Sequence, residues 1–387
     1  MSLMPARIAA SRDRVRSQPT HDDRTLAVLG LALGACFTVC FATGLLSHLI
    51  QNPPGWFTWP ARPAGLYRVT QGVHVATGLA SIPLLLAKLW AAGPRLVDEP
   101  IARDVAHALE RLSLVPLVGG SLFLVASGTA NLSHWYPWPF SFPPAHYAAA
   151  WVTIGALVVH IVAKVAQTRD ALSRSPRGAE VAAGPAAAGA LSRRGFLGAT
   201  AAATGLVTLA TAGQTVGPLR RLALLAPRRP DVGPQGLPVN RTAGGAGVAA
   251  SAGDERYRLE VTGRVATPLS LSLSELRSMP QRTARLPIAC VEGWSASATW
   301  VGVPVRDLLE RAGAPAGAEV TVRSLQTRGS YATSELNPGQ AADRDTLLAL
   351  AIGDEPLHRD HGFPVRLIGP NRPGVQQTKW VRRLEVR

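Results

Sequence analysis

Long apolar stretches alternate with short polar loops through the first 215 residues of the chain. A helix needs about 20 apolar residues to cross the hydrocarbon core of a bilayer. Five stretches approach or exceed that length with almost no charge, at residues 26–50, 69–90, 112–132, 148–165 and 195–217. The pattern therefore predicts a four-helix membrane domain over residues 26–170 and a fifth membrane helix within residues 171–217.

The pattern changes towards the C-terminus. Residues 218–253 are rich in Pro, Gly, Ala and Arg, lack a regular period and predict an extended linker. Beyond them, YRLEVTG, FPVRLIGP and WVRRLEVR predict strands, and VPVRDLLERAG predicts an amphipathic helix ended by Gly. We therefore expect a multi-domain chain, with an all-α transmembrane four-helix bundle, a fifth helix, and a mixed α+β domain over residues 254–387.

Arginine clusters set the expected orientation in the membrane. They lie in the N-terminal tail, residues 1–25, and in the segment that follows the fourth apolar stretch. Cytoplasmic loops carry an excess of Lys and Arg, so both segments are predicted to be cytoplasmic and the domain 254–387 to be extracytoplasmic. Abundant Arg and Ala indicate a bacterial source. We therefore expect a multi-pass protein of the bacterial inner membrane.

The charge balance bears on the partners of the chain. The net charge is +15, although only 17% of the residues are charged. Such a basic balance is typical of nucleic-acid binding, but these arginines lie at the ends of apolar helices, where membrane orientation explains them. We therefore expect membrane lipid as a partner, and no nucleic acid.

The fifth apolar stretch begins with Ser192-Arg193-Arg194-Gly195-Phe196-Leu197. This motif resembles the twin-arginine export signal, a receptor-read address used in bacteria. The alternative is that two arginines simply fix the orientation of a spanning helix. The resemblance implies that the twin-arginine export machinery is a partner, and that the following domain folds around a cofactor before it is exported.

Histidines lie within or at the ends of the predicted membrane helices, and they are His48, His74, His146 and His160. Polar residues in a membrane are costly, and paired histidines in a helical bundle commonly hold b-type haem. His146 and His160 are about 21 Å apart along one helix face, which suits two stacked haems. Pairing of His74 with His160, or of His48 or His74 with His146, stays open. Binding of quinone is the alternative to haem ligation.

Cys290 is the one cysteine in the polar part of the chain, between an apolar strand and a polar turn. A lone buried Cys is ordinarily a small hydrophobic residue. The residues after it, however, resemble the molybdenum-binding segment of the sulfite oxidase family, which includes the catalytic subunits of bacterial periplasmic methionine sulfoxide reductases. The matching residues are Cys290, Trp300, Gly302, Pro304, Leu308 and Leu309. The resemblance extends over residues 257–387, and a soft metal such as molybdenum favours one thiolate ligand.

The resemblance also implies the residues that hold the molybdopterin cofactor. His361, Arg366 and Lys379 fall at positions that bind the pterin and its phosphate, for which Arg and Lys are suited. Asn240 in the linker is a further candidate. Arg372, in the turn PNRPG, is another, although the family often has a glycine-rich turn there, which leaves the role of Asn371 and Arg372 open.

Tyr331 aligns with a tyrosine near the metal and is predicted to be catalytic, through a hydrogen bond to an oxo group or the substrate. The family's arginines that bind anionic sulfite are replaced by Glu292-Gly293-Trp294. The membrane part resembles bacterial cytochromes b that exchange electrons with quinone. We therefore expect oxygen-atom transfer on a small-molecule substrate, with reduction of a sulfoxide favoured. Sulfite-type oxidation is the alternative, and a non-catalytic membrane receptor or assembly protein with the same fold is another.

Overall fold

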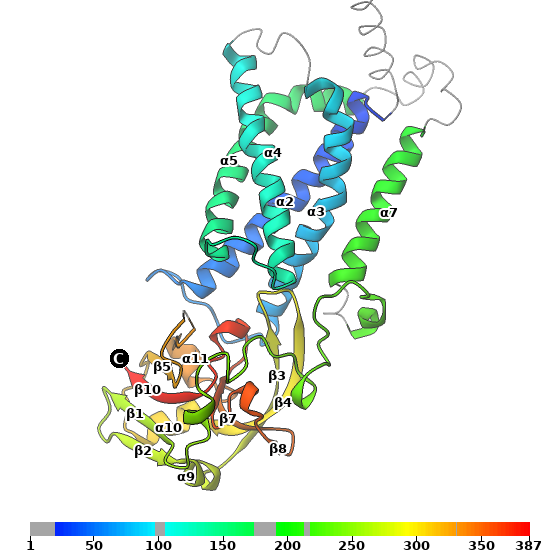
Figure 1. Ribbon diagram of the computed structural model, residues 1–387. Helices are drawn as coiled ribbons and strands as arrows, with labels where there is room; N and C mark the ends of the chain where they lie inside the picture. The colour runs from blue at the N-terminus through cyan, green and yellow to red at the C-terminus, as the bar shows by residue number, and fades with distance from the viewer. Residues whose placement is uncertain (1–19, 97–104, 174–190, 213–216, 330) are drawn as a thin grey trace, which may run out of the picture. The chain divides into compact units, whose positions relative to one another are not determined.

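The computed structural model describes residues 20–96, 105–173, 191–212, 217–329 and 331–387 (Figure 1). The chain forms two compact units. The first unit contains most of the long helices, at residues 1–42, 73–213 and 222–225. The second unit contains both sheets and also the adjoining ends of the first two long helices, at residues 43–72, 214–221 and 226–387.

Among the described residues up to Ala212 there are five long helices, as the apolar stretches predict. They are α2 (Asp23–Gln51), α3 (Leu66–Leu96), α4 (Val105–Leu132), α5 (Phe142–Ser173) and α7 (Arg193–Ala212). Each is long and apolar enough to cross a membrane. The fifth apolar stretch, expected to reach residue 217, is helical as far as it is described, to Ala212, and residues 213–216 lie outside the described part of the chain.

Close helix contacts hold the first unit together. Leu29 and Leu33 of α2 pack with Leu84 and Leu85 of α3. Helices α4 and α5 approach closely at Gly120, where an added Cβ would lie 2.2 Å from Thr153 Oγ1. Small residues at such crossings allow two backbones to come together, which is how apolar helices associate where water does not drive them.

Two five-stranded sheets form the second unit. The first has the order β2-β1-β10-β5-β6, with β1 and β10 parallel and the other pairs antiparallel. The second has the order β3-β4-β7-β8, with β9 also paired to β7. The strands are β1 (Arg258–Gly263), β2 (Leu269–Ser272), β3 (Arg282–Ala289), β4 (Ser295–Pro304), β5 (Val320–Ser324), β6 (Thr333–Leu336), β7 (Leu347–Ile352), β8 (Glu355–Pro356), β9 (Arg366–Ile368) and β10 (Val381–Val386).

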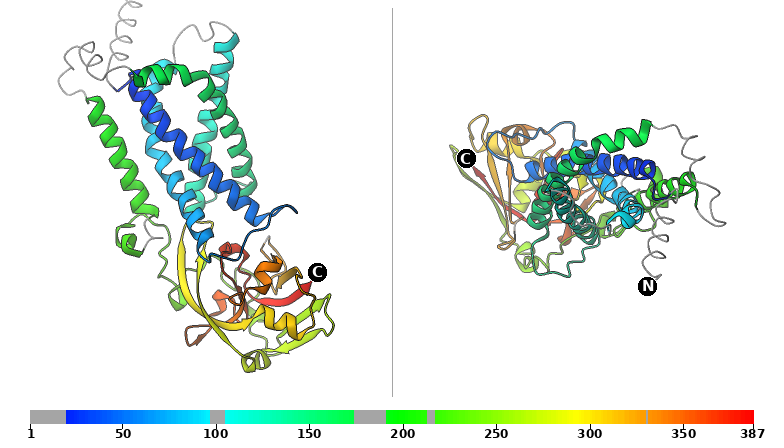
Figure 2. Two further views of the ribbon diagram at one scale, coloured as in Figure 1. Left: turned by 180° about the vertical axis from the view of Figure 1, so that it is seen from behind. Right: turned by 90° about the horizontal axis from the view of Figure 1, so that it is seen from above.

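Short helices connect these strands. They are α8 (Ala249–Ala252), α9 (Leu273–Ser278), α10 (Val305–Arg311), α11 (Pro338–Ala342) and the 3-10 helices η2 (Gly217–Leu222), η3 (Pro234–Gly236), η4 (Arg359–His361) and η5 (Gly374–Gln376). Ser272 and Glu275 form a capping box that fixes the start of α9. The hairpin β3–β4, seen in yellow in Figures 1 and 2, ends in the turn that contains Cys290.

The segment predicted as an extended linker packs on the second unit along part of its length. Leu237 is buried in the same cluster as Cys290 and Trp300. Ala243, Val248 and Ala252 pack on Trp380. These apolar residues are sparse and follow no helix or strand period, so a pattern of hydrophobic positions gives no sign that they are buried.

Gly302 on β4 is expected to be essential for stability. A Cβ at this position would lie 2.1 Å from Leu348 O and 2.6 Å from Ala349 Cα on β7. Because the opposing atoms are backbone, relief requires separating two central strands. We expect Gly302→Ala to lower the thermal unfolding midpoint of the purified chain by about 5–10 °C. Gly339→Ala, whose Cβ would lie 3.5 Å from Asn337 Oδ1, is the control, and an equal effect of both changes would contradict this reading.

Candidate functional site

Cys290 lies in the turn between β3 and β4 and is 2% exposed. The turn is closed by hydrogen bonds from Cys290 N to Trp294 O, 2.9 Å, and from Gly293 N to Cys290 O, 3.1 Å. Gly293 adopts a φ of 84°, which favours glycine. Burial raises the pKa of the Cys290 thiol, and the nearby Glu292 carboxylate raises it further. A thiolate at this place therefore needs a strongly positive partner, such as a metal ion.

Asn240 contacts the sulfur directly. Its Nδ2 donates to Cys290 Sγ at 2.9 Å, so a residue 50 positions earlier in the chain reaches the turn. Asn240 Oδ1 is buried and makes no hydrogen bond within the described part of the chain. A buried polar atom of this kind ordinarily has a partner, so the side chain is suited to a ligand that donates a hydrogen bond.

Three predicted cofactor residues gather beside this turn. Arg366 Nη1 donates to His361 O at 3.2 Å, and the Lys379 ammonium donates to Asp360 O at 2.7 Å. Gly362, with a φ of 112°, allows the approach, because a Cβ there would lie 3.1 Å from the Cβ atoms of both Arg366 and Lys379. The Arg366 guanidinium also lies over the Trp300 ring, 5.3 Å from its centroid. The structure therefore brings His361, Arg366 and Lys379 together.

This cluster has a positive charge that burial makes unfavourable. Burial lowers the pKa of Arg366 to about 10. Burial, followed by the Arg366 charge, lowers the pKa of Lys379 to about 7. Burial also lowers the pKa of His361 to about 4. Among the described residues, Arg366 Nε has no hydrogen-bond partner. An anion would relieve the repulsion and accept this N–H, and a phosphate fits both requirements.

Tyr331 and Arg372 occupy different surroundings. Tyr331 is 45% exposed. Its pKa is raised by burial and then by the charges of Cys290 and Glu292, so the phenol lies within electrostatic range of the cysteine. Arg372 is buried and donates to Glu335 O and Gln376 O, each at 3.0 Å. Its described hydrogen bonds go to residues other than Cys290, His361, Arg366 and Lys379, although its Nε has no partner in the described structure.

Sequence reasoning missed one residue of this site, Arg228. It lies 3.5 Å, measured from Nε to Oε2, from the buried carboxylate of Glu292. The same oxygen accepts from Trp294 Nε1 at 3.2 Å. Glu292 follows the cysteine closely and is therefore evident in the sequence, whereas Arg228 is one of many arginines in an irregular segment and carries no local signal.

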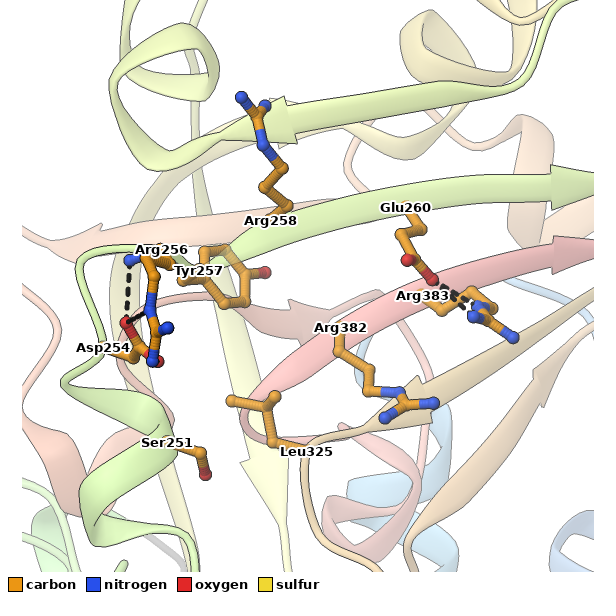
Figure 3. A pocket seen from close by; sticks show the side chains of 9 residues that line it. All are labelled: Ser251, Asp254, Arg256, Tyr257, Arg258, Glu260, Leu325, Arg382 and Arg383. Carbon is orange, nitrogen blue, oxygen red and sulfur yellow. Dashed lines mark hydrogen bonds and ion pairs between the residues drawn. The ribbon is translucent and has the colours of Figure 1, made fainter.

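A separate pocket of about 440 Å³ lies on the other sheet, beside β1 and β10 (Figure 3). Its charged walls include the pairs Asp254–Arg256 and Glu260–Arg383. None of the predicted site residues lines it. The chemistry argued above therefore belongs to the Cys290 turn rather than to this pocket.

The four histidines proposed as haem ligands differ in their hydrogen bonds and in the compact unit to which they belong. His74 Nδ1 lies 2.8 Å from Cys40 O, and His146 Nδ1 lies 3.0 Å from Ser127 Oγ. His74 and His146 are within electrostatic range of each other in the first unit. His160 lies 14 residues beyond His146 on α5, and His48 lies near the end of α2, in the second unit. Of the pairs left open by the sequence, His74 and His146 are the one that interacts electrostatically in the described structure.

Comparison with known families identifies the C-terminal part of the chain. A family model described as "Oxidoreductase molybdopterin binding domain" matches residues 246–387. Residues 246–387 are thus similar to the domains that this model describes. The expected resemblance to molybdenum-dependent oxidoreductases is thereby confirmed for this part of the chain. Arg366, Lys379 and the polar atoms that lack a partner among the described residues fit the cofactor that such a domain binds.

Individual relatives agree. "Putative protein-methionine-sulfoxide reductase subunit YedZ1" of Azospira oryzae is 33% identical over 34% of this chain and 48% of its own. "Uncharacterized oxidoreductase YuiH" of Bacillus subtilis is 31% identical over 34% of this chain and 65% of its own. "Sulfite oxidase" of Gallus gallus is 34% identical over 34% of each chain. The present chain thus spans less than two thirds of the length of each of these relatives.

Among solved structures, the sulfane dehydrogenase SoxCD from Paracoccus pantotrophus matches at 26% identity. The match covers 34% of this chain and 38% of that chain, with a TM-score of 0.31. At this TM-score the match adds nothing to the assignment of the fold, which rests on the family of the molybdopterin-binding domain.

Proposed function

We propose that the chain is a membrane-anchored, molybdopterin-dependent oxidoreductase that transfers an oxygen atom to or from a small substrate outside the cytoplasm. The observation that carries the proposal is the set of groups around Cys290: a buried sulfur bound by Asn240, near the buried Arg366 and the partly buried Lys379. Asn240 Oδ1 and Arg366 Nε have no partner in the described structure, so this set is suited to a bound polar and anionic group.

Each predicted site residue has a place in this proposal. Cys290 would ligate molybdenum, and Asn240 would orient its sulfur. His361, Arg366 and Lys379 would hold the pterin and its phosphate, with Arg372 supporting the turn on the far side. Tyr331, half-exposed beside the cysteine, would bind substrate. When bound, the molybdenum cofactor supplies two-electron oxygen-atom chemistry, and the protein sets its ligand, orientation and access.

Reduction of a sulfoxide-like substrate is the favoured activity. Glu292 places a buried carboxylate near Cys290, where the sequence lacks the arginines expected for an anionic substrate. The Glu292 carboxylate already pairs with Arg228, so that cation is less available to an anionic substrate, whereas a neutral sulfoxide needs no counter-charge. The name of the relative from Azospira oryzae points to the same substrate class. The similarity to the chicken sulfite oxidase keeps sulfite-type oxidation as a second candidate.

The membrane part would supply the electrons. We assign residues 1–25 to a cytoplasmic tail and residues 26–170 to a cytochrome b-like bundle that exchanges electrons with quinone through b-type haem. The proximity of His74 and His146 supports haem ligation. Residues 171–217 would contain the twin-arginine helix, and residues 218–253 would connect it to the domain 254–387 outside the inner membrane. The five apolar helices support this arrangement.

Metal analysis combined with a reoxidation assay tests the proposal. We expect the purified full chain to contain molybdenum in proportion to protein, and the chemically reduced protein to be reoxidised by methionine sulfoxide. Each turnover would take two electrons and two protons and release the sulfide and water. The absence of molybdenum from protein with intact Cys290 would leave only the receptor or assembly role. Reduction of the oxidised protein by sulfite, without reaction with sulfoxides, would select the sulfite-type oxidase.

A further inference from the structure

The adjoining ends of the first two long helices are built into the molybdopterin-binding domain. Residues 43–72 lie in the same compact unit as residues 226–387. They comprise the end of α2, the connecting loop and the first turns of α3. A membrane tether needs only a flexible linker to its domain, so contacts this extensive call for another explanation.

Four of the hydrogen bonds in this contact converge on one residue, Asn371. Tyr67 N donates to its Oδ1 at 2.7 Å, and its Nδ2 donates to Pro60 O at 2.7 Å. Its backbone N donates to Ala64 O at 2.9 Å, and its backbone O accepts from Trp59 Nε1 at 2.9 Å. Asn371 is 2% exposed. The backbone N–H and C=O of Asn371 and both polar atoms of its side chain are thus hydrogen-bonded to residues 59–67.

The backbone conformation of Asn371 is compatible with this role. Its φ is 54°, in the left-handed region where glycine is favoured and Asn is among the best tolerated of the other residues. Glycine would satisfy the backbone at least as well. The asparagine side chain is therefore explained by its bonds to the loop, which answers the question that the turn PNRPG raised in the sequence.

The opposite side of the same turn packs against the strand that leads to Cys290. Pro373 forms a parallel β-bridge with Ala289, the residue that precedes the cysteine. A Cβ on Gly374 would lie 3.0 Å from Ala289 O, so the two backbones are in close contact. Ile50 and Tyr67 also pack on Ala289. Ala289 is thus held both by the turn and by the ends of the two helices.

A buried polar group extends the contact to the other side of the cysteine. Gln71 Nε2 donates a long hydrogen bond, 3.4 Å, to the carbonyl of Val291. Ser47 donates to Gln71 Oε1 at 3.1 Å, and its hydroxyl lies 3.1 Å from that of Tyr67. All three side chains are buried, so losing one partner leaves the others unsatisfied.

Ion pairs at the rim add to this docking. Arg62 Nε lies 2.9 Å from Asp343 Oδ2, and its guanidinium also pairs with Asp345, which Arg282 binds at 2.6 Å. The Arg62 side chain is 51% exposed, so these pairs contribute little to stability and chiefly fix the register of the loop.

We propose that Asn371 and residues 59–71 are positioning elements for Cys290, so that the membrane helices complete the metal-binding segment of the soluble domain. The functional meaning of this inference rests on the proposed molybdenum site. Its structural content does not, because the contacts that hold Ala289 and Val291 are made by groups of the protein itself.

Hydrogen exchange on the full-length protein in detergent tests the proposal. The variant Asn371→Gly keeps the backbone conformation but removes the side-chain bonds. We expect exchange in residues 288–294 to become about 5- to 30-fold faster, because one or more buried hydrogen bonds are lost. Exchange in β5 should stay unchanged. In the loaded protein the same variant should lose molybdenum faster than the unmodified chain and show an altered Mo(V) resonance spectrum.

The control is Asn52→Gly, the same substitution in the same segment, where the amide bonds only His48 O and is exposed. It should leave exchange and molybdenum retention unchanged. Should Asn371→Gly fail to accumulate, Trp59→Phe removes a single donor to Asn371 O and should shift exchange in the same direction by less. Unchanged exchange in residues 288–294 overturns the proposal. Absence of molybdenum from the unmodified chain would overturn the proposed function alone.

Discussion

Replacing Cys290 by Ser is expected to lower oxygen-atom turnover by more than about a hundredfold. Removing a direct metal ligand should reduce activity more than removing a residue that only orients such a ligand. The hydroxyl of serine is a harder and less readily ionised ligand than a thiol, and the site disfavours negative charge on that side chain. Molybdenum content should fall far less, because Arg366, which is buried, and Lys379, which is partly buried, would still hold the pterin phosphate.

Cys36→Ser provides the matched control, because Cys36 is also a free cysteine but lies on α2, in the other unit. It should leave turnover and molybdenum content unchanged. Turnover and metal content are measured on the same purified samples. If Cys290→Ser kept normal turnover, Cys290 would be a packing residue and the proposed metal ligand would be wrong. If both quantities fell together, the serine would instead be preventing the domain from folding around its cofactor.

The long helices were predictable because hydropathy reports directly on the part of a helix that suits a bilayer. Their ends were less so. Helix α5 begins at Phe142 and ends at Ser173, well beyond the predicted stretch 148–165, since its polar last turns continue the helix where apolar character has stopped. In the second unit, strands with clear alternation were recognisable, but the burial of Leu237 and Val248 was not, because isolated apolar residues carry no period.

The site residues also divide into those that the sequence predicted and those that it did not. Cys290, His361, Arg366 and Lys379 lie in motifs whose order along the chain is characteristic, and the structure brings them together. Asn240 and Arg228 come from an irregular segment in which many residues look alike. The contacts of Asn371 with residues 59–67 join positions about three hundred apart in sequence, with separations of 304 for Tyr67 and 311 for Pro60. Nothing local encodes such a contact.

The second large effect is expected in the membrane part, where His74→Ala and His146→Ala should each remove or alter the reduced-minus-oxidised absorbance of the b-type haem that these two residues ligate. The Nδ1 of His74 is hydrogen-bonded to Cys40 O, and the Nδ1 of His146 is hydrogen-bonded with Ser127 Oγ. In each histidine Nε2 is therefore the nitrogen available to iron. Six-coordinate haem needs two such ligands, so losing either one should release the haem or change its spectrum.

His160→Ala distinguishes one haem from two. His160 lies about 21 Å along α5 from His146, too far to ligate the same iron. With one haem held by His74 and His146, His160→Ala should keep the full band, whereas with two haems the band should shrink but persist. In either case the haem of His74 and His146 remains. Loss of all absorbance in His160→Ala, with His146→Ala unaffected, would refute the pairing that the structure favours. A normal spectrum in all three variants, or none in the unmodified chain, would remove haem from the electron path and leave quinone binding as the role of these histidines.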